Sequence, residues 1–199
     1  MTTGIETWYV GEDTQKKDHF VNKPTGQLHE FYLSGTIGEP GKYIEWFNTM
    51  RHAQEGDVIM LYINSYGGDL YTALQFMPII RATEATVVAQ VEGACMSAAT
   101  LIALSCESFV ISAESSWMIH NYSGGTMGKG GEMVDQVTFE RKWSQKFMKE
   151  AYHGFLTAKE IQSVLDGRDL WLDADEVIKR LTRKAKAAGK EVRTGEAGK

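Results

Sequence analysis

The sequence predicts a mixed α/β fold built on a largely parallel sheet. Two almost continuously apolar segments, 57–64 and 86–91, have the composition of strands that are covered on both faces. A segment with apolar residues at helical spacing follows each of them, and two further strand candidates lie at 107–112 and 116–120. Strands that alternate with helices are joined by right-handed crossovers, so this order favours parallel pairing within one sheet.

The N-terminal half supplies the first predicted helices. A short strand is expected at 31–35, and the segment 42–54 places apolar side chains at helical spacing. The helix after 57–64 is predicted from apolar residues that recur on one face: Leu70, Ala73, Leu74, Met77 and Ile80. Pro78 should kink or shorten this helix, because proline has no backbone N–H to donate.

The C-terminal half is predicted to be mainly helical. A long helix over 132–153 carries a row of residues spaced four apart among charged ones: Phe139, Trp143, Phe147 and Ala151. The stretches TAKE (157–160) and DADE (173–176) match the capping-box pattern, so each predicts the start of a short helix. The loop DGRDLWL (166–172) separates these two helices.

Composition narrows the classes of function. The chain has 199 residues, of which 43% are hydrophobic, and a net charge of −5, which fits one globular domain and gives no support for a nucleic-acid partner. No apolar run reaches membrane-spanning length, and the N-terminus has no apolar signal segment, so we expect a cytoplasmic protein without a membrane partner. Cys95 and Cys106 lie in apolar segments without the spacing of a metal site, so we expect buried thiols and no metal.

Ser97 and His120 are the first candidate functional residues. Ser97 lies in GACMSAAT (93–100), between a predicted strand and a predicted buried helix. A serine in this place either fills a tight core corner or is a nucleophile on a sharp strand-to-helix turn. His120 ends the strand candidate 116–120, where it is either a base for such a nucleophile or a histidine bonded to nearby backbone.

Two glycine-rich segments accompany these candidates. Gly67 and Gly68 follow a strand and precede a helix, where backbone N–H groups can form an oxyanion hole or where the chain simply turns. The segment 123–132 fits neither the Walker pattern nor the strand–loop–helix Gly-x-Gly-x-x-Gly pattern. We therefore expect no nucleotide and no other cofactor.

Four motifs, in the order of the chain, resemble those of the ClpP peptidases, which are the proteolytic subunits of Clp proteases. The resemblance runs from about residue 57 to residue 181. The motifs are Asn-Ser-Tyr-Gly-Gly (64–68), Gly-Ala-Cys-Met-Ser (93–97), Met-Ile-His (118–120) with Gly124-Gly125 after it, and Arg-Asp-Leu-Trp (168–171). The separations from Gly68 to Ser97, from Ser97 to His120 and from His120 to Asp169 are 29, 23 and 49 residues, and they match the family closely.

This resemblance implies a ClpP/crotonase-like fold of repeated β-β-α units with a long protruding handle helix. The peptidase domain would span 31–182 and include the handle at about 126–156. Residues 1–30 would be a divergent N-terminal segment, and 183–199 a flexible, basic C-terminal tail.

The resemblance also implies a serine endopeptidase that hydrolyses peptide bonds through an acyl-enzyme. Ser97 resembles the nucleophile, His120 the general base and Asp169 the carboxylate that orients this base. The backbone N–H groups of Gly68 and Ala98 resemble the oxyanion hole. The implied partners are peptides or unfolded proteins, further copies of the chain in stacked heptameric rings (a single ring being the alternative), and an AAA+ unfoldase.

The chain departs from the family pattern at several positions. Tyr66 replaces the usual proline, and the residues after His120 also lack one, which concerns the shape of the substrate groove. Little of the family's N-terminal gate is recognisable before Asp57, so dependence on an unfoldase stays open. Virus-encoded and other divergent relatives tolerate an N-terminal change of this kind, so the resemblance implies a divergent member of the family and leaves both a cellular and a viral origin open.

Other readings stay open at this stage. Asp166 and Asp173 compete with Asp169 for the role of the acid, although the end of one helix and the N-cap of the next explain them better. A crotonase-like acyl-CoA enzyme would use paired backbone N–H groups and would need no Ser-His-Asp set. A catalytically silent ring subunit or scaffold would keep these residues without aligning them.

Overall fold

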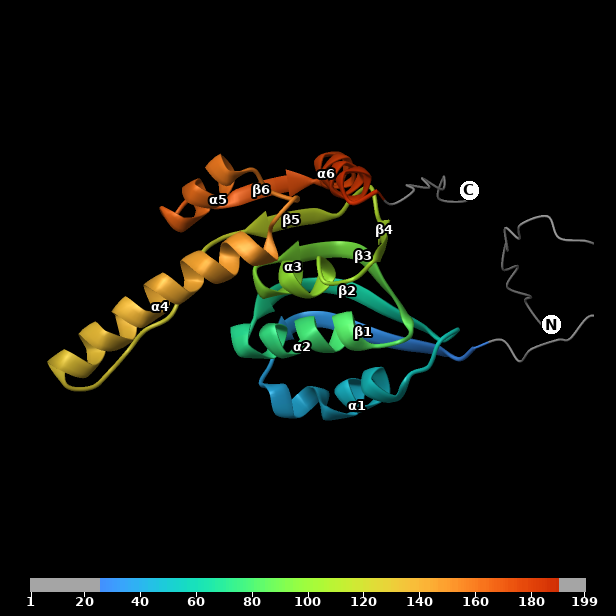
Figure 1. Ribbon diagram of the computed structural model, residues 1–199, viewed down its shortest axis with the longest axis horizontal. Helices are drawn as coiled ribbons and strands as arrows, with labels where there is room; N and C mark the ends of the chain where they lie inside the picture. The colour runs from blue at the N-terminus through green and yellow to red at the C-terminus, as the bar shows by residue number, and fades with distance from the viewer. Residues whose placement is uncertain (1–25, 190–199) are drawn as a thin grey trace, which may run out of the picture.

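A computed structural model describes residues 26–189, which form one sheet with helices packed around it (Figure 1). The strands in this part of the chain are β1 (Leu28–Ile37), β2 (Val58–Gly68), β3 (Thr86–Met96), β4 (Ser108–Ile111), β5 (Ser116–Ile119) and β6 (Leu170–Asp173). The helical elements are the 3-10 segment η1 (Pro40–Tyr43) and the helices α1 (Ile44–His52), α2 (Leu70–Ala82), α3 (Ala98–Ala103), α4 (Gly130–Ala151), α5 (Ala158–Leu165) and α6 (Ala174–Ala187).

The largely parallel sheet predicted from the sequence is confirmed. Its strands are ordered β1-β2-β3-β5-β6, and β4 pairs with β3 off this path. Every pair is parallel except β5 with β6, which is antiparallel. β3 changes partner along its length, because residues 88–91 pair with β4 and residues 94–96 pair with β5. The C-terminal end of β3 therefore lies beside β5.

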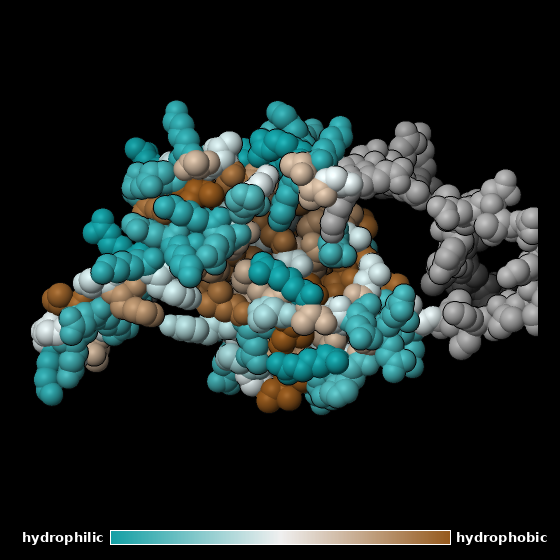
Figure 2. Space-filling model, in the orientation of Figure 1, coloured by the Kyte–Doolittle hydropathy of each residue, from teal (hydrophilic) through white to brown (hydrophobic). Residues whose placement is uncertain are grey.

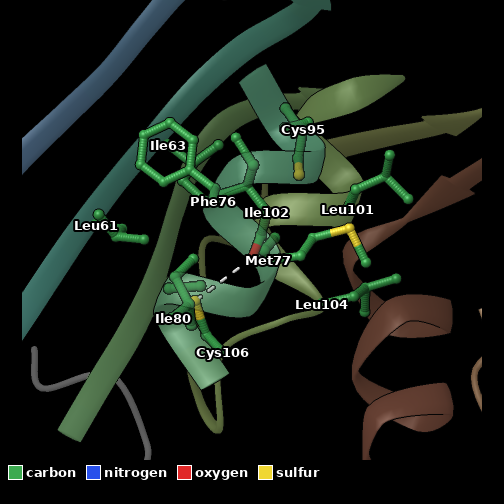
Figure 3. Close-up of a cluster of buried hydrophobic side chains, with 14 of the residues drawn as sticks. Leu61, Ile63, Phe76, Met77, Ile80, Cys95, Leu101, Ile102, Leu104 and Cys106 are labelled. Atoms are coloured by element: carbon green, nitrogen blue, oxygen red, sulfur yellow. Dashed lines mark hydrogen bonds between the residues drawn. The ribbon is translucent and has the colours of Figure 1, made fainter. Parts of the chain in front are cut away.

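The core lies where α2 and α3 pack on the central strands. Figure 3 shows side chains from β2, α2 and α3 meeting there, among them Leu61, Phe76 and Ile102. Cys95 and Cys106 belong to the same cluster as free, buried thiols, as expected from the sequence. The expectation that these strands are covered on both faces is wrong in part, because in β2 and the first half of β3 every second residue is buried and the residues between are half-buried or exposed.

The long helix α4 extends away from the body of the molecule (Figure 1). It carries hydrophilic and hydrophobic side chains together, as the hydropathy colours of Figure 2 show. Its most exposed apolar side chains are Val134, Val137 and Phe139. This helix matches the predicted protruding helix over 132–153 and falls within the expected handle at about 126–156. Within residues 26–189, no helix is both long and apolar enough to cross a membrane.

The two short C-terminal helices begin where the sequence predicts. At α5, Thr157 Oγ1 accepts a hydrogen bond from the Glu160 N–H, and the Glu160 carboxylate accepts one from the Thr157 N–H. At α6, Asp173 accepts from the Glu176 N–H, but the Glu176 carboxylate accepts from Arg180 instead of completing the box. Arg180 also donates to both carboxylate oxygens of Glu160, so it ties α6 to α5.

The prediction of a loop over 166–172 is wrong in part, because residues 170–173 form the strand β6. This strand pairs with β5 from Leu170 opposite Ile119 to Asp173 opposite Ser116. A strand of four residues shows too few alternations to be recognised from its own sequence. It forms because the edge of β5 offers backbone partners.

The helix α2 is not shortened by Pro78, since it continues to Ala82. Proline removes one backbone hydrogen bond from a helix interior. The neighbouring side chains Met77, Ile79 and Ile80 are all buried in the core. Their packing offsets the lost bond, because tertiary burial of an apolar face supplies most of the stability of a helix within a protein.

The expected segment boundaries also shift. β1 begins at Leu28, so residues 28–30 belong to the sheet and not to the N-terminal segment 1–30. α6 ends at Ala187, so residues 183–187 are helical and not part of a flexible tail over 183–199. Residues 1–25, which include His19, and residues 190–199 lie outside the described part of the chain.

Candidate active site

Ser97 lies on a strained turn between β3 and α3. Its φ of 53° and ψ of −126° make it the only non-glycine residue with a positive φ within residues 26–189. Such a conformation costs on the order of 1–3 kcal/mol and persists only where the surroundings hold it. Here the Ser97 N–H donates to the Met118 carbonyl (2.8 Å), and the Ser97 carbonyl accepts from the Thr100 N–H (3.0 Å). The sharp strand-to-helix turn predicted from the sequence is therefore present.

The imidazole of His120 lies against the Ser97 hydroxyl. His120 directly follows β5, and the distance from its Nε2 to Ser97 Oγ is 2.6 Å. This proximity follows from the sheet, because Met96 at the end of β3 pairs with Met118 of β5. An imidazole nitrogen at hydrogen-bond distance is within reach of the hydroxyl proton that a general base removes.

Two glycines bring the end of β2 close to this turn. A Cβ on Gly67 would lie 2.7 Å from the Cβ of Ser97 and 2.7 Å from the carbonyl oxygen of Met96. Gly67 also has a φ of +91°, so glycine is required here both for space and for conformation. Gly68 and Ala98 line the same cavity as Ser97, and Ala98 is the first residue of α3, where backbone N–H groups lack a partner within the helix.

Asp169 and His120 lie at the same end of the β5–β6 pair, but no hydrogen bond joins their side chains in the described part of the chain. Asp169 directly precedes β6, whose Leu170 pairs with Ile119, so Asp169 and His120 both stand one residue beyond the last strand pair. The Asp169 side chain is exposed, and within residues 26–189 no hydrogen bond or ion pair joins it to the imidazole. The structure brings Ser97 and His120 together and leaves Asp169 apart.

The two competing carboxylates take the helix-end positions expected of them. Asp166 is the C-cap residue of α5 and accepts a hydrogen bond from Gln162 Nε2 at 2.9 Å. Asp173 is the N-cap residue of α6 and accepts from the Glu176 N–H at 2.9 Å. Both carboxylates thus have a structural partner, which Asp169 lacks within the described residues.

A cavity opens beside Ser97 and His120, and its wall combines polar residues (Asn121, Tyr122, Ser123 and Ser144) with larger, mostly apolar ones. The larger ones come from three helices: Leu70 from α2, Leu101 from α3, and Phe147 and Met148 from α4, with Tyr152 at the C-terminal end of α4. The apolar part of this wall is suited to an apolar side chain held near the serine hydroxyl, and the polar part supplies groups that can form hydrogen bonds.

The contribution of α4 to this cavity was missed by the sequence analysis. The inner part of the aromatic row packs on α2, because Trp143 stacks on Phe147 (ring centroids 5.4 Å apart) and on Tyr71 (6.3 Å). Only the outer residue, Phe139, is largely exposed, at 65%. The signal available in the sequence was the extension of the row to Ala151, which is buried and leads into the body of the protein.

The remaining ionisable candidates play no part in the cavity wall. Burial raises the pKa of the Cys95 thiol well above its usual value, which fits a protonated core side chain. Within residues 26–189, no three histidine, cysteine or acidic side chains come close enough together to hold a metal ion.

Known proteins resemble the chain in both sequence and fold. A family model described as Clp protease matches residues 42–180. A mutant of ClpP1 from Listeria monocytogenes is similar in structure, with a TM-score of 0.61 and 20% identity over 76% of this chain and 86% of that one. A comparison with curated proteins gives no significant match. The structural likeness shows the mixed α/β fold, and these comparisons give no support to a viral source.

Proposed function

Because this chain belongs to the Clp protease family, we propose that it is a serine endopeptidase that cleaves peptide bonds through an acyl-enzyme on Ser97. The observation that carries the proposal is the 2.6 Å contact between Ser97 Oγ and His120 Nε2. The strained turn at Ser97 supports it, since backbone strain of this kind gathers at functional sites.

In the proposed reaction, His120 Nε2 takes the proton of the Ser97 hydroxyl while Oγ attacks the carbonyl carbon of the substrate. The N–H groups of Gly68 and Ala98 donate to the oxyanion that forms. His120 then gives its proton to the leaving amine, and a water molecule releases the acyl group by the same route in reverse. Loss of one such donor typically slows an enzyme by about 10²–10³-fold.

Asp169 is proposed to orient His120 during turnover. A carboxylate that accepts the Nδ1–H leaves Nε2 free to act as the base and stabilises the imidazolium that forms. The pairing of Leu170 with Ile119 supports this role, because it leaves the Asp169 backbone at the same end of the β5–β6 pair as His120. Its exposed side chain has to turn toward the ring to make this contact.

The proposed substrates are peptides or unfolded proteins that present an apolar side chain. The cavity beside Ser97 is walled by Leu70, Leu101, Phe147 and Met148, which favour such a group over a charged one. A peptide also has to reach the serine in an extended form, which a compact folded protein does not offer.

The proposed active form is a homo-oligomer of stacked heptameric rings, with a single ring as the alternative. The helix α4 supports assembly, because Val134, Val137 and Phe139 are 64%, 51% and 65% exposed on a helix that extends from the body. Several large apolar side chains exposed on one projecting helix are candidates for a contact with another subunit. The proposal includes a cytoplasmic location, in line with two free thiols, and delivery of substrate by an AAA+ unfoldase.

One observation favours a second candidate, a catalytically silent ring subunit. Within the described residues, no hydrogen bond or ion pair joins Asp169 to His120, and an imidazole without its carboxylate partner is a weaker base. The two candidates differ in one measurable property, which is the reactivity of the Ser97 hydroxyl.

Labelling with a fluorophosphonate probe, followed by mass spectrometry of the labelled peptide, tests the proposal. We expect label on Ser97 in the natural protein and none in Ser97→Ala, while Ser163→Ala on the exposed face of α5 keeps full labelling and peptide hydrolysis. A folded and assembled natural protein that neither labels nor hydrolyses peptides would establish the silent subunit instead.

A further inference from the structure

Two buried hydroxyl groups form a chain of hydrogen bonds that ends at the Ser97 carbonyl. Thr100 in α3 is fully buried, and Tyr152 at the end of α4 is 2% exposed. Thr100 Oγ1 donates to the Ser97 carbonyl at 2.7 Å and lies 2.6 Å from the Tyr152 hydroxyl. These contacts join the nucleophile turn to a residue 52 positions further along the chain than Thr100.

The direction of the hydrogen bonds follows from counting protons. A threonine hydroxyl has one proton, and that of Thr100 is given to the Ser97 carbonyl. The second contact of Thr100 must then be an acceptor contact, so Tyr152 donates to it. Burial raises the pKa of the Tyr152 hydroxyl, so this donor keeps its proton at the pH where a histidine acts as a base.

From this geometry we infer that Thr100 and Tyr152 are positioning residues that hold the Ser97 peptide so that Oγ faces His120. The inference rests on the proposed function. The Ser97 carbonyl accepts two bonds, from the Thr100 N–H and from Thr100 Oγ1, and the bond from Tyr152 fixes the direction of that hydroxyl.

The bonds to the Ser97 carbonyl stabilise a strained backbone conformation. A φ of 53° is unfavourable for serine, so the turn relaxes unless both of its backbone polar groups are engaged. The N–H is engaged by the Met118 carbonyl of β5, and the carbonyl by Thr100. Tyr152 is the C-cap residue of α4, so the support on the carbonyl side begins at the base of the projecting helix.

The test compares two variants that each remove one buried phenol hydroxyl and keep the ring. Tyr152→Phe breaks the bond to Thr100, whereas Tyr43→Phe breaks a bond from the Gly38 N–H, away from the cavity. We expect Tyr152→Phe to lower kcat and the rate of probe labelling about tenfold, or about 1.4 kcal/mol of activation free energy, with KM nearly unchanged. Tyr43→Phe should keep the kcat and labelling rate of the natural protein, even if its Tm falls by as much as that of Tyr152→Phe.

Substitutions at Thr100 supply the rescue and the coupling measurement. Thr100→Ser retains the hydroxyl and should keep most of the activity, while Thr100→Val should lose as much as Tyr152→Phe. The double variant Thr100→Val/Tyr152→Phe should lose little more than either single one, because both remove the same chain of bonds. Unchanged kcat and labelling rate in Tyr152→Phe would overturn the inference.

A second readout separates this inference from the proposed function. Hydrogen exchange of the segment 93–101 should be faster in Tyr152→Phe than in the natural protein, and unchanged in Tyr43→Phe. If the natural protein proves inert toward peptides and probe, the proposed function fails, and exchange still decides whether Tyr152 holds the turn. Equal exchange of this segment in the natural protein and Tyr152→Phe would show that it does not.

Discussion

Replacing Gly67 by alanine should disable Ser97 by displacing it. The added Cβ would lie 2.7 Å from Ser97 Cβ and from the Met96 carbonyl oxygen, whereas ordinary contacts of a Cβ begin at 3.4 Å, so about 0.7 Å has to be gained. Neither neighbour is the end of a flexible side chain, so the nucleophile turn itself has to move. A misplacement of about 1 Å at a reacting group can cost on the order of 10²-fold in rate. We therefore expect kcat/KM to fall about 10²-fold.

Gly35→Ala is the matched control for this variant. Gly35 also has a positive φ, +74°, but a Cβ there would meet nothing within 4 Å. Gly35→Ala is therefore destabilised only by the unfavourable backbone conformation, by roughly 1–2 kcal/mol. Peptide hydrolysis and probe labelling, measured beside Tm and native mass, separate lost stability from lost activity. If Gly67→Ala were as active as Gly35→Ala, the close approach of β2 to Ser97 would not affect catalysis.

Further substitutions test other parts of the structure. Arg180→Ala should lower the free energy of unfolding by about 3 kcal/mol in urea titrations, because it leaves the Glu160 carboxylate without the partner that it meets in a part-buried ion pair. The bond from Arg180 lowers the pKa of Glu160 from 4.5 to about 2. The ionised Glu160 therefore contributes its full stabilisation above pH 4.5, and this stabilisation should be lost as the pH falls from 4.5 toward 2. In Arg180→Ala, this part of the pH dependence of stability should disappear. Asp169→Asn should lower kcat strongly in peptide hydrolysis while Asp173→Asn changes little, since asparagine caps a helix about as well as aspartate; equal effects would refute the assignment of the acid. Phe139→Glu should reduce the oligomer seen by analytical ultracentrifugation and lower activity with it, and an unchanged oligomer would place the contact elsewhere.

Most of the sheet could be predicted from the sequence, because its central strands carry a strong local signal. The runs at 57–64 and 86–91 are almost continuously apolar, and both form strands, although the structure buries only one face of each and leaves the other half-buried or exposed. The short strand β6 could not be predicted in this way. Its four residues become a strand through pairing with β5, which is a property of the assembled sheet and not of the segment itself.

In the candidate site too, features with a local sequence signal could be predicted, and features that depend on tertiary packing could not. Ser97 follows β3 and Gly67 lies at the end of β2, in segments whose small residues are visible in the sequence, and the family resemblance predicts that His120 lies beside Ser97. The wall that α4 adds to the cavity depends on how a distant helix packs, and so does the contact between Thr100 and Tyr152. Neither hydroxyl stands in a motif, so only the folded chain brings them together.

Asp169 shows most clearly what spacing predicts and what it does not. A separation of 49 residues from His120, together with the pairing of Leu170 with Ile119, sets the two backbones at adjacent strand ends. A hydrogen bond needs side-chain placement to within a few tenths of an ångström, and an exposed carboxylate without a partner has several rotamers of similar energy. Ser97, in contrast, is held in its strained conformation by backbone bonds on both sides of the turn, and its hydroxyl lies at hydrogen-bond distance from His120. The proposed nucleophile and base are therefore already in contact within one chain, whereas the side chain of the proposed orienting acid is not fixed by a hydrogen bond or ion pair within the described residues.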